Sequence, residues 1–564
     1  MAEIIIMPKL GFNMDEGQLV KWHRRVGETV KKGEVLFEIN TDKTTMPVEA
    51  TADGTVLQLM LEEGAFAEVF TPIAVIGAPG EDPNAVLNGP ATPQAAPAAP
   101  AEPAGYDYDV VVIGAGPGGY ETAIKAAQCG EKTCIIEGAG FGGTCLNVGC
   151  IPTKALIQTA DVYHKVKDAA RFAVTGVEAD KIAVDMAALQ ARKKAVVKTL
   201  VNGVKGLLRG NKVTVVEGMA SFADTHTLSV DGRSITGANI IIATGSSVFM
   251  PPFLALEGEN HLLTSTEALD LDQVPASVTV IGGGVIGVEF AYLLNRLGSK
   301  VTVLELMDHI LPMVDIEVSR LAEKRMTKDG ILFRLGAKVS RVKDDTVYYE
   351  FGGQECQVKS DMVLMAVGRV PNTQGLNAEG IGIEFDRKAI RTDAHMRTNI
   401  PHIYAIGDVN GKVMLAHTAS HEGMVAVADI CGQGEEMRYD RIPSCVYLEP
   451  EIACIGLTEA QAREKYGDGL KIGRFNMAAN GKSLIAGDTD GLFKVIVAAD
   501  TGEILGAHLY GQHVTDMIGE ISAAMAAEGT AEELIHAIHP HPTVNEALGE
   551  AFMAAWNGRA INSL

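Results

Sequence analysis

The N-terminal part of the chain alternates hydrophobic and polar residues with a period of two, a pattern that predicts β-strands. The stretch GQLVKWHRRVGETVKKGEVLFEI from Gly17 can be laid on GTVLQLMLEEGAFAEVFTPIAVI from Gly54 with matching glycines. Such self-similarity indicates two copies of one structural unit. Between them stands the polar turn sequence INTDKTTM, which predicts Lys43 at an exposed hairpin tip, with Pro47 interrupting the next strand.

A different pattern starts at Tyr108, where YDVVVIGAGPGGYETAIKAAQCGEKTCIIE predicts a buried strand, a turn, a helix and a second strand. In the turn, Gly114 permits a tight bend, Gly116 lets the backbone approach a pyrophosphate, and Gly119 allows close helix-to-strand packing. Glu137 ends the second strand and can hold a ribose hydroxyl. A glycine-rich turn can occur without any ligand, but the flanking elements and the acid favour a dinucleotide site.

The same pattern returns at Val278 in VTVIGGGVIGVEFAYLLNRLGSKVTVLEL, with glycines at Gly282, Gly284 and Gly287 and an acid at Glu305. The first glycine and the acid are 23 residues apart in both copies. Two dinucleotides are therefore expected. A carboxylate at Glu305 would accept from a free 2′-hydroxyl and repel a 2′-phosphate, which favours NAD over NADP in the second site.

Composition adds domain boundaries and excludes some partners. The stretch 79–105 is rich in Pro and Ala and predicts an extended linker, with a reach on the order of 80 Å at roughly 3.1 Å per residue. At 564 residues the chain is too long for one core. Its formal charge of −23 disfavours nucleic acid and anionic membranes as partners. Because apolar runs such as 240–243 are short and no signal-peptide pattern is present, we expect a cytoplasmic protein without a membrane span.

Eight cysteines are too few for a disulfide scaffold, but Cys145 and Cys150 form a motif five positions apart. Two thiols near a helix N-terminus can form a strained, exchangeable disulfide whose thiolates the helix dipole stabilises. Zinc binding is the alternative, which the absence of a second Cys or His pair nearby disfavours. No metal is expected.

The segment GGTCLNVGCIPTK closely resembles the redox-disulfide motif of the pyridine nucleotide disulfide oxidoreductases, and of dihydrolipoamide dehydrogenases in particular. The resemblance covers residues 106–564. It implies that Cys145 is the thiol that exchanges with the substrate disulfide and that Cys150 lies beside a flavin. It also implies an ion pair of Lys154 with Glu289 beside the isoalloxazine, although either residue could be an ordinary surface charge.

Further matches to this family concern FAD. They are IIIATGS with Thr244 and Gly245, AVGRVPN through Arg369, and IYAIGD ending in Asp408. Family members use that Asp on the ribityl chain of the flavin. An acid directly after a strand could equally be a helix cap.

Near the C-terminus, IHPHPTVNEALGEA matches the family motif HPTxxE at His541 and Glu546. The resemblance implies that His541 is the acid/base and that Glu546 orients it, leaving His539 out. A solvated or metal-binding cluster of these histidines with His536 is the alternative. In the family the base reaches into the active site of the other subunit, and VYLEPEIACIGLTE resembles the start of the interface domain, so a homodimer is expected.

Residues 1–78 resemble a lipoyl domain modified on the lysine of its Asp-Lys turn. Asp42 precedes Lys43 and Thr44 follows it, whereas a biotinyl lysine would lie between two methionines, so covalent lipoate on Lys43 is expected. Asn40 departs from the Glu that lipoyl domains often have. An unmodified surface lysine is the alternative.

The resemblances together imply a multidomain chain of the α/β and α+β classes. We expect an all-β lipoyl sandwich at 1–78, a flexible linker at 79–105, a Rossmann-like FAD-binding domain at 106–253 and 377–440, a Rossmann-like NAD-binding domain at 254–376, and an α+β dimerisation domain at 441–564. The expected cofactors are FAD, NAD and lipoate.

The expected activity is oxidation of protein-bound dihydrolipoamide through the redox disulfide and FAD, with hydride passing to NAD. The expected partners are a lipoyl-bearing acyltransferase or other subunits of a 2-oxo acid dehydrogenase or related complex. Glu305 and the IPTK sequence disfavour glutathione reductase, and NGRAINSL lacks the C-terminal Cys pair of mercuric reductase. A carrier or scaffold role is a different class of hypothesis, which the intact CLNVGC and HPTVNE segments disfavour.

Overall fold

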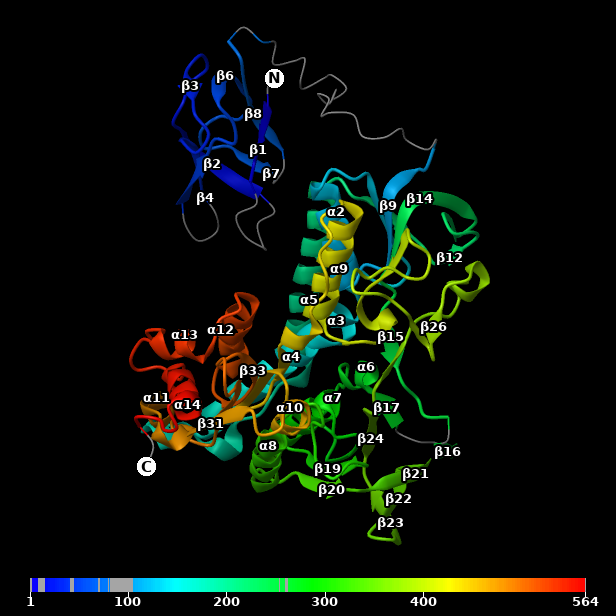
Figure 1. Ribbon diagram of the computed structural model, residues 1–564, viewed down its shortest axis with the longest axis vertical. Helices are drawn as coiled ribbons and strands as arrows, with labels where there is room; N and C mark the ends of the chain where they lie inside the picture. The colour runs from blue at the N-terminus through cyan, green and yellow to red at the C-terminus, as the bar shows by residue number, and fades with distance from the viewer. Residues whose placement is uncertain are drawn as a thin grey trace. The chain divides into compact units, whose positions relative to one another are not determined.

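The computed structural model describes residues 3–8, 16–40, 45–68, 71–79, 81, 105–252, 254–258 and 262–562. The chain forms two compact units, Met1–Tyr106 with Asn202–Gly210, and Asp107–Val201 with Asn211–Leu564. Figure 1 shows the helices and strands of both units and labels many of them. Among the described residues, no helix is both long and apolar enough to cross a membrane.

The N-terminal unit contains two four-stranded antiparallel sheets that enclose one apolar core. The first sheet has the order β1 (Glu3–Ile6), β8 (Pro72–Gly77), β6 (Gly54–Leu59) and β3 (Thr29–Val30). The second has the order β5 (Thr45–Glu49), β4 (Val35–Asn40), β2 (Glu16–Trp22) and β7 (Phe66–Glu68). The predicted all-β sandwich is confirmed.

The strand pairing has the symmetry expected of a duplication. Short strand β3 of the first half pairs with β6 of the second, and β7 of the second half pairs with β2 of the first. Gly27 and Gly64, which the alignment makes equivalent, have left-handed φ angles of 90° and 88°. Both halves therefore make the same tight turn, which glycine adopts without steric cost.

The strand after the polar turn differs from the expectation. Pro47 does not interrupt it, because Pro47 lies inside β5 and pairs with Glu38. Strand β5 is the edge strand of its sheet, where a residue without an N–H removes no bond to a further strand. Strands β4 and β5 pair up to Asn40 and Thr45, whereas Lys43 and most of the predicted linker lie outside the described residues.

The first dinucleotide motif forms the predicted strand–helix–strand unit. Strand β9 (Tyr108–Ile113), helix α2 (Pro117–Gln128) and β10 (Thr133–Glu137) follow one another, and β9 pairs in parallel with β10 and β14. The other strands of this sheet are β11 (Thr214–Glu217), β14 (Arg233–Ile242), β13 (Thr227–Val230), β12 (Ala220–Phe222) and β28 (Ile403–Ala405). Its helices are α3 (Gly143–Val148), α4 (Cys150–Lys167), α5 (Met186–Gly210) and α9 (Ala416–Ile430).

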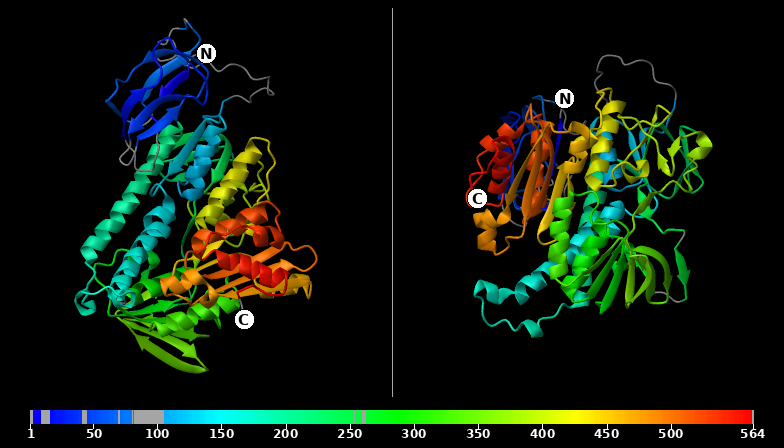
Figure 2. Two further views of the ribbon diagram at one scale, coloured as in Figure 1. Left: turned by 90° about the vertical axis from the view of Figure 1, so that its left-hand side faces the viewer. Right: turned by 60° about the horizontal axis from the view of Figure 1, so that its bottom comes forward.

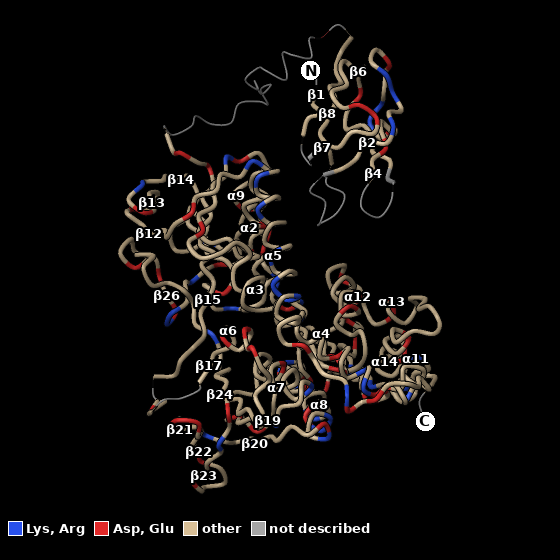
Figure 3. The backbone as a smooth tube through the Cα atoms, turned by 180° about the vertical axis from the view of Figure 1, so that it is seen from behind, with Lys and Arg blue, Asp and Glu red and all other residues tan. Residues whose placement is uncertain are grey.

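Helix α5 departs from the acidic character of the chain. It carries six Lys or Arg residues and no Asp or Glu, and Figure 3 shows these basic positions spread along its length. The net charge is therefore unevenly distributed, with the negative excess on other elements.

The second motif builds a five-stranded parallel sheet, with helix α7 (Val285–Leu297) following its central strand. The strands are β17 (Leu262–Thr264), β24 (Met362–Met365), β18 (Ser277–Ile281), β19 (Lys300–Glu305) and β20 (Leu332–Leu335), with helices α6 (Ser265–Ala268) and α8 (Ile316–Lys328). A second sheet consists of β16 (Ala255–Glu257), β21 (Lys338–Lys343), β22 (Thr346–Phe351) and β23 (Gln354–Lys359). Two-stranded pairs are β15 (Ser246–Val248) with β25 (Arg369–Pro371), and β26 (Phe385–Asp386) with β27 (Ala389–Ile390).

The C-terminal part is a five-stranded antiparallel sheet (Figure 2); α12, α13 and α14 pack on one of its faces, and Ala462 of α10 packs on the other. Its order is β29 (Ser444–Val446), β30 (Glu451–Gly456), β33 (Ile504–Gly511), β32 (Leu492–Ala498) and β31 (Leu470–Asn476). The helices are α10 (Glu459–Tyr466), α11 (Gly481–Ala486), α12 (Val514–Ala526), α13 (Ala531–His536) and α14 (Glu546–Trp556). Strands β32 and β33 are buried along their whole length. This apolar centre explains why their sequences do not alternate.

Candidate redox site

The two cysteines of the motif lie in two consecutive helices, the short α3 and the longer α4. Cys145 is inside α3 and half-buried, whereas Cys150 is exposed and forms the first residue of α4. Both are thiols in this structure. The backbone of Gly143, with φ of 55°, approaches that of Gly116 so closely that a Cβ on Gly143 would lie 2.7 Å from the Gly116 Cα. The cysteine-bearing helices are thus held directly against the first dinucleotide turn.

The two thiols differ in acidity because one donates a hydrogen bond to the other. The bond to Cys150, with burial, raises the pKa of Cys145, so this sulfur stays protonated. The same bond lowers the pKa of Cys150, and Lys154 one helical turn later adds to the effect. Burial opposes this second shift but is outweighed, and Cys150 as a whole residue is exposed. Its position at the N-terminus of α4 further favours a thiolate.

The predicted pairing of Lys154 with Glu289 is present in the structure. Lys154 Nζ lies 2.6 Å from Glu289 Oε2, and the Glu289 side chain is 4% exposed. The other oxygen of Glu289 accepts from the backbone N–H of Tyr447 at 3.1 Å, and Lys154 lies over the Tyr447 ring. This buried cluster therefore joins three separate segments of the chain at the cysteines.

A second polar cluster connects the matches at Thr244–Gly245, Arg369 and Asp408. The hydroxyl of Ser246 donates to Asp408, while Arg369 donates to the Ser246 hydroxyl and carbonyl at 2.7 and 2.6 Å. Arg369 also reaches the Thr144 hydroxyl, next to Cys145, at 3.4 Å. The cluster places the guanidinium beside the cysteine-bearing helix α3.

Thr244 and Gly245 are held by Asn372, the last residue of the AVGRVPN segment. The Thr244 hydroxyl donates to the carbonyl of Asn372 at 2.7 Å, and the Asn372 side chain donates back to the Thr244 carbonyl at 3.1 Å. Gly245 has a left-handed φ of 72° and accepts from the Asn372 N–H at 2.9 Å. The turn after β14 is thereby fixed against β25.

The first dinucleotide turn has the backbone that its glycines predict. Gly114 has φ of 102°, and a Cβ on Gly119 would lie 1.9 Å from the Gly114 carbonyl oxygen. At Gly116 the nearest atom to such a Cβ is 3.9 Å away, so this side of the turn is open. Helix α2 has no side-chain N-cap, and Glu137 accepts from the N–H groups of Ala115 and Gly140 at 2.6 and 2.8 Å.

The second turn repeats this geometry. Gly282 has φ of 110°, a Cβ on Gly287 would meet the Gly282 carbonyl oxygen at 2.0 Å, and Gly284 faces open space. Glu305 accepts from the N–H groups of Gly283 and Met307. Helix α7 likewise has no side-chain N-cap.

The C-terminal histidines are distinguished by their surroundings. His541 Nδ1 lies 2.9 Å from Glu546 Oε1, and its side chain is 80% exposed. His539 is 10% exposed and pairs with Glu520 at 3.0 Å. Burial favours the neutral form of Glu546, but the Thr543 N–H and His541 outweigh it and hold the pKa of Glu546 below its usual value. His541 is thus an accessible ring oriented by a carboxylate, whereas His539 is enclosed.

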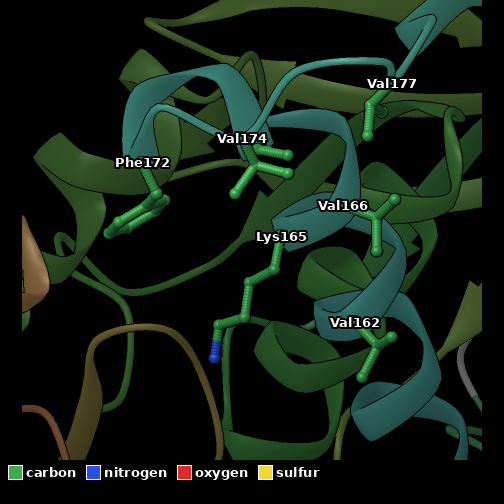
Figure 4. A pocket seen from close by; sticks show the side chains of 7 residues that line it. Val162, Lys165, Val166, Phe172, Val174 and Val177 are labelled. Atoms are coloured by element: carbon green, nitrogen blue, oxygen red, sulfur yellow. The ribbon is translucent and has the colours of Figure 1, made fainter.

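Within one chain, His541 with its partner Glu546 lies apart from Cys145 and Cys150. Figure 1 shows α13 and α14, which flank His541, separated from α3. A groove lined by Val162, Lys165, Val166, Phe172, Val174 and Val177 with Ala169 lies along the far end of α4 (Figure 4). Its lining is apolar apart from Lys165, so this groove is not the place of the redox chemistry.

Comparisons with known proteins agree with this geometry. A family model for pyridine nucleotide-disulphide oxidoreductases matches residues 108–423, and the model for their dimerisation domain matches 442–552. The chain belongs to the pyridine nucleotide-disulphide oxidoreductases. A biotin and lipoyl model, described as biotin-requiring enzyme, matches residues 3–76, so this flavoprotein disulfide oxidoreductase carries an N-terminal domain of the lipoyl type.

Relatives of this oxidoreductase cover nearly all of it after the linker. A dihydrolipoyl dehydrogenase of Bacillus subtilis is 42% identical over 451 residues, which cover 79% of this chain and 98% of that protein. A mitochondrial dihydrolipoyl dehydrogenase of Schizosaccharomyces pombe is 41% identical over 81% of this chain and 91% of its own. The solved structure of the HOCl-induced flavoprotein disulfide reductase RclA from Escherichia coli matches with a TM-score of 0.70 and 31% identity, over 79% of this chain and 99% of that chain.

Membership of this family implies FAD and NAD, and the two glycine turns fit them. At Gly116 and Gly284 a side chain would fill the open space above an uncapped helix N-terminus, where backbone N–H groups and the helix dipole favour a pyrophosphate. The matching dimerisation domain is the C-terminal sheet with its helices. It indicates that this oxidoreductase forms a homodimer.

Sequence reasoning missed several residues that hold this site. Glu422 of α9 is fully buried and accepts from the Gly407 N–H, Asn410 and the Tyr439 hydroxyl at 2.5, 2.9 and 2.5 Å. Burial raises the pKa of its carboxyl. Glu422 thereby fixes the loop that carries Asp408. An acid in the mostly apolar stretch 422–430 was the available signal for Glu422, whereas Ser246 and Tyr447 had none.

Proposed function

We propose that this flavoprotein oxidises dihydrolipoamide to lipoamide with NAD as the electron acceptor. The observation that carries the proposal is the presence of a lipoyl-type domain on the same chain as an oxidoreductase whose relatives are named dihydrolipoyl dehydrogenase. We propose further that Lys43 bears the lipoyl group and that the enzyme works in a 2-oxo acid dehydrogenase or related lipoyl-dependent complex. A tethered dithiol would reach millimolar effective concentration, on the order expected for flexible linkers.

In the proposed reaction, His541 of the partner copy takes the proton from one thiol of the substrate, and Glu546 orients the ring. The resulting thiolate attacks the sulfur of Cys145 in the Cys145–Cys150 disulfide, and Cys150 leaves as a thiolate. The second substrate thiol then displaces Cys145, which completes the substrate disulfide and leaves Cys145 protonated. The lowered pKa of Cys150 and the raised pKa of Cys145 match these end states.

Lys154 and the N-terminus of α4 would hold the negative charge on Cys150, and Glu289 keeps Lys154 in place. FAD, when bound, would accept the electron pair of the dithiol and deliver it as hydride to NAD. The residues that we propose bind FAD are Gly114, Gly116, Gly119, Glu137, Thr244, Gly245, Arg369 and Asp408. Those that we propose bind NAD are Gly282, Gly284, Gly287 and Glu305. We propose the domain boundaries given under Sequence analysis for these roles.

The test is NADH-dependent reduction of free lipoamide by the purified full-length protein, with oxidised glutathione as a parallel substrate. We expect lipoamide turnover that the Cys150→Ser variant loses, while NADH oxidation by an artificial acceptor persists in that variant. Turnover of glutathione but not of lipoamide would mean that the disulfide chemistry is right and the substrate wrong.

A further inference from the structure

Outside the redox motif, two further cysteines come from packed helices. Helices α2 and α9 lie side by side (Figure 1). A Cβ built on Gly118 would lie 2.9 Å from the Cβ of Ala419, and one on Gly423 would lie 1.7 Å from the Thr122 hydroxyl. These contacts, four residues apart on both helices, set the register between them. Continued toward the C-termini, the register brings the ends of the two helices together.

Both helices end in the same way. Cys129 is the C-cap of α2 and Cys431 the C-cap of α9, with φ of −78° and −82°. Each is followed by a left-handed glycine, Gly130 with φ of 99° and Gly432 with φ of 74°. This termination is common because glycine adopts left-handed φ without steric cost. The register of Gly118 with Ala419 and of Thr122 with Gly423 puts Cys129 within one position of the level of Cys431.

The helix register makes the two cysteines neighbours, and a hydrogen bond with Cys129 is one of the causes that raise the pKa of the Cys431 thiol. Cys129 is exposed and Cys431 half-buried, so the pair is open to small molecules from one side. The two residues are 302 positions apart and lie on either side of the segment that forms the second parallel sheet. Their proximity is therefore a product of the tertiary fold.

We propose that Cys129 and Cys431 form a second, reversible disulfide, formed by peroxides, that clamps α2 to α9. In this reaction the Cys129 thiolate attacks hydrogen peroxide, which gives a sulfenic acid and, after proton transfer, water. The Cys431 thiol then displaces the sulfenic hydroxyl, so that an S–S bond forms and a second water leaves. Two thiols are oxidised and one peroxide is reduced to two waters. A small dithiol reverses the reaction by exchange.

The environment of this pair separates it from Cys145 and Cys150. Cys150 lies at a helix N-terminus, where the dipole stabilises a thiolate, whereas Cys129 and Cys431 lie at C-termini, where it does the opposite. Burial and the neighbouring Cys129 raise the pKa of Cys431 to about 11. Cys431 therefore stays a thiol, and the pair leaves the attack on peroxide to the exposed Cys129. It suits a protective clamp and not a catalytic relay.

The clamp would act on the proposed FAD site. Helix α2 starts at the glycine turn of Gly116, and α9 carries Glu422, which fixes the loop of Asp408. A bond between the far ends of these helices removes independent motion of the two segments. Because the bond closes a very long loop, it restricts the unfolded chain strongly. Retention of FAD at elevated temperature is the expected gain.

The test uses the full-length protein purified with its flavin and treated with hydrogen peroxide. Non-reducing peptide mapping should find a peptide pair joined through Cys129 and Cys431, with the loss of two hydrogen atoms. Peroxide should raise the temperature of flavin release by on the order of 5 °C. Cys129→Ser and Cys431→Ser should each abolish both the cross-link and the shift. Cys356→Ser, which changes a half-buried thiol of β23, should keep both.

Two outcomes would overturn the inference. One is oxidation of Cys129 or Cys431 to sulfinic acid without a cross-linked peptide, which would mean that the sulfurs cannot reach bonding distance. The other is a thermal shift on peroxide treatment that is equal in Cys129→Ser and in the wild-type protein, which would assign the shift to another group. Both readouts are independent of lipoamide turnover, so the inference stands or falls separately from the proposed function.

Discussion

Lys154 Nζ and Glu289 Oε2 are 2.6 Å apart and form an ion pair whose acidic partner is buried. The pair links α4, which begins at Cys150, to α7, which follows the second glycine turn. Tyr447 at the start of the dimerisation domain completes it through its N–H. The three segments that must cooperate in the proposed reaction thus meet at one carboxylate.

Replacing Lys154 should cost both stability and thiolate character. Lys154→Gln leaves the Glu289 carboxylate buried without its cation, which costs about 3 kcal/mol in the free energy of unfolding. It should also raise the pKa of Cys150, because Lys154 lowers that pKa now. Urea unfolding and the ultraviolet absorbance of the thiolate as a function of pH measure the two effects.

The matched control is Lys165→Gln on the same helix. Lys165 is 64% exposed and pairs with Glu449 at 3.0 Å, so its replacement should change stability by less than about 1 kcal/mol. Equal losses in the two variants would mean that the Lys154 pair has no special place in the site.

The reduced enzyme should show an alkylation profile with pH that reflects a lowered pKa of Cys150. Its thiolate forms above the folded pKa, so the rate with iodoacetamide should rise at a pH below the ordinary thiol range of about 8.5. The thiolate also contributes stability that is present above the unfolded pKa and is lost as pH falls through the folded pKa.

Cys145→Ala should move this profile to higher pH, because the hydrogen bond from Cys145 is the largest cause of the shift. Cys445→Ala, which changes a half-buried cysteine at the start of the dimerisation domain, serves as the control and should leave it in place. An unmoved profile in Cys145→Ala would contradict the proposed donor.

His541→Gln should reduce lipoamide turnover by a factor on the order of 10²–10⁴, as expected for loss of a general acid/base. NADH oxidation by an artificial acceptor should be unchanged, because the acceptor takes its electrons from the flavin and not from the cysteines. His539→Gln is the matched control. Its ring is enclosed and pairs with Glu520, so we expect lower thermal stability with most of the turnover retained.

Co-expression tests whether the base acts on the other subunit. A dimer of one His541→Gln chain and one Cys150→Ser chain retains one complete site only if His541 serves the cysteines of its partner. We expect the purified mixed dimer to regain up to half of the wild-type turnover. A mixed dimer without activity would place the base in the same chain.

Lys43→Arg should abolish the mass increment of a lipoyl group while leaving turnover of free lipoamide intact. In the sequence the lysine comes between β4 and β5, and its replacement by Arg keeps the charge. Mass spectrometry of the intact protein expressed with lipoate checks the first expectation. An unmodified wild-type protein under the same conditions would remove the carrier role of the N-terminal domain.

Local rules were enough for part of this molecule. The two glycine turns, the duplicated β halves and the motif of Cys145 and Cys150 could be predicted, because each depends on residues close together in the chain. At such positions φ, hydrogen bonding and side-chain period act over a few residues. The expectation that Pro47 interrupts a strand was wrong, because a local rule of strand propensity does not tell whether the strand lies at the edge of its sheet.

The sequence by itself thus determined the elements, the family resemblance and the residues able to carry the chemistry. Only the tertiary structure decided that His539 is enclosed with Glu520 while His541 is accessible, and that Glu422 holds the Asp408 loop. It alone brought Cys129 next to Cys431. The physical reason is that burial, acidity and reactivity depend on neighbours far away in the chain, and packing between helices and sheets chooses those neighbours.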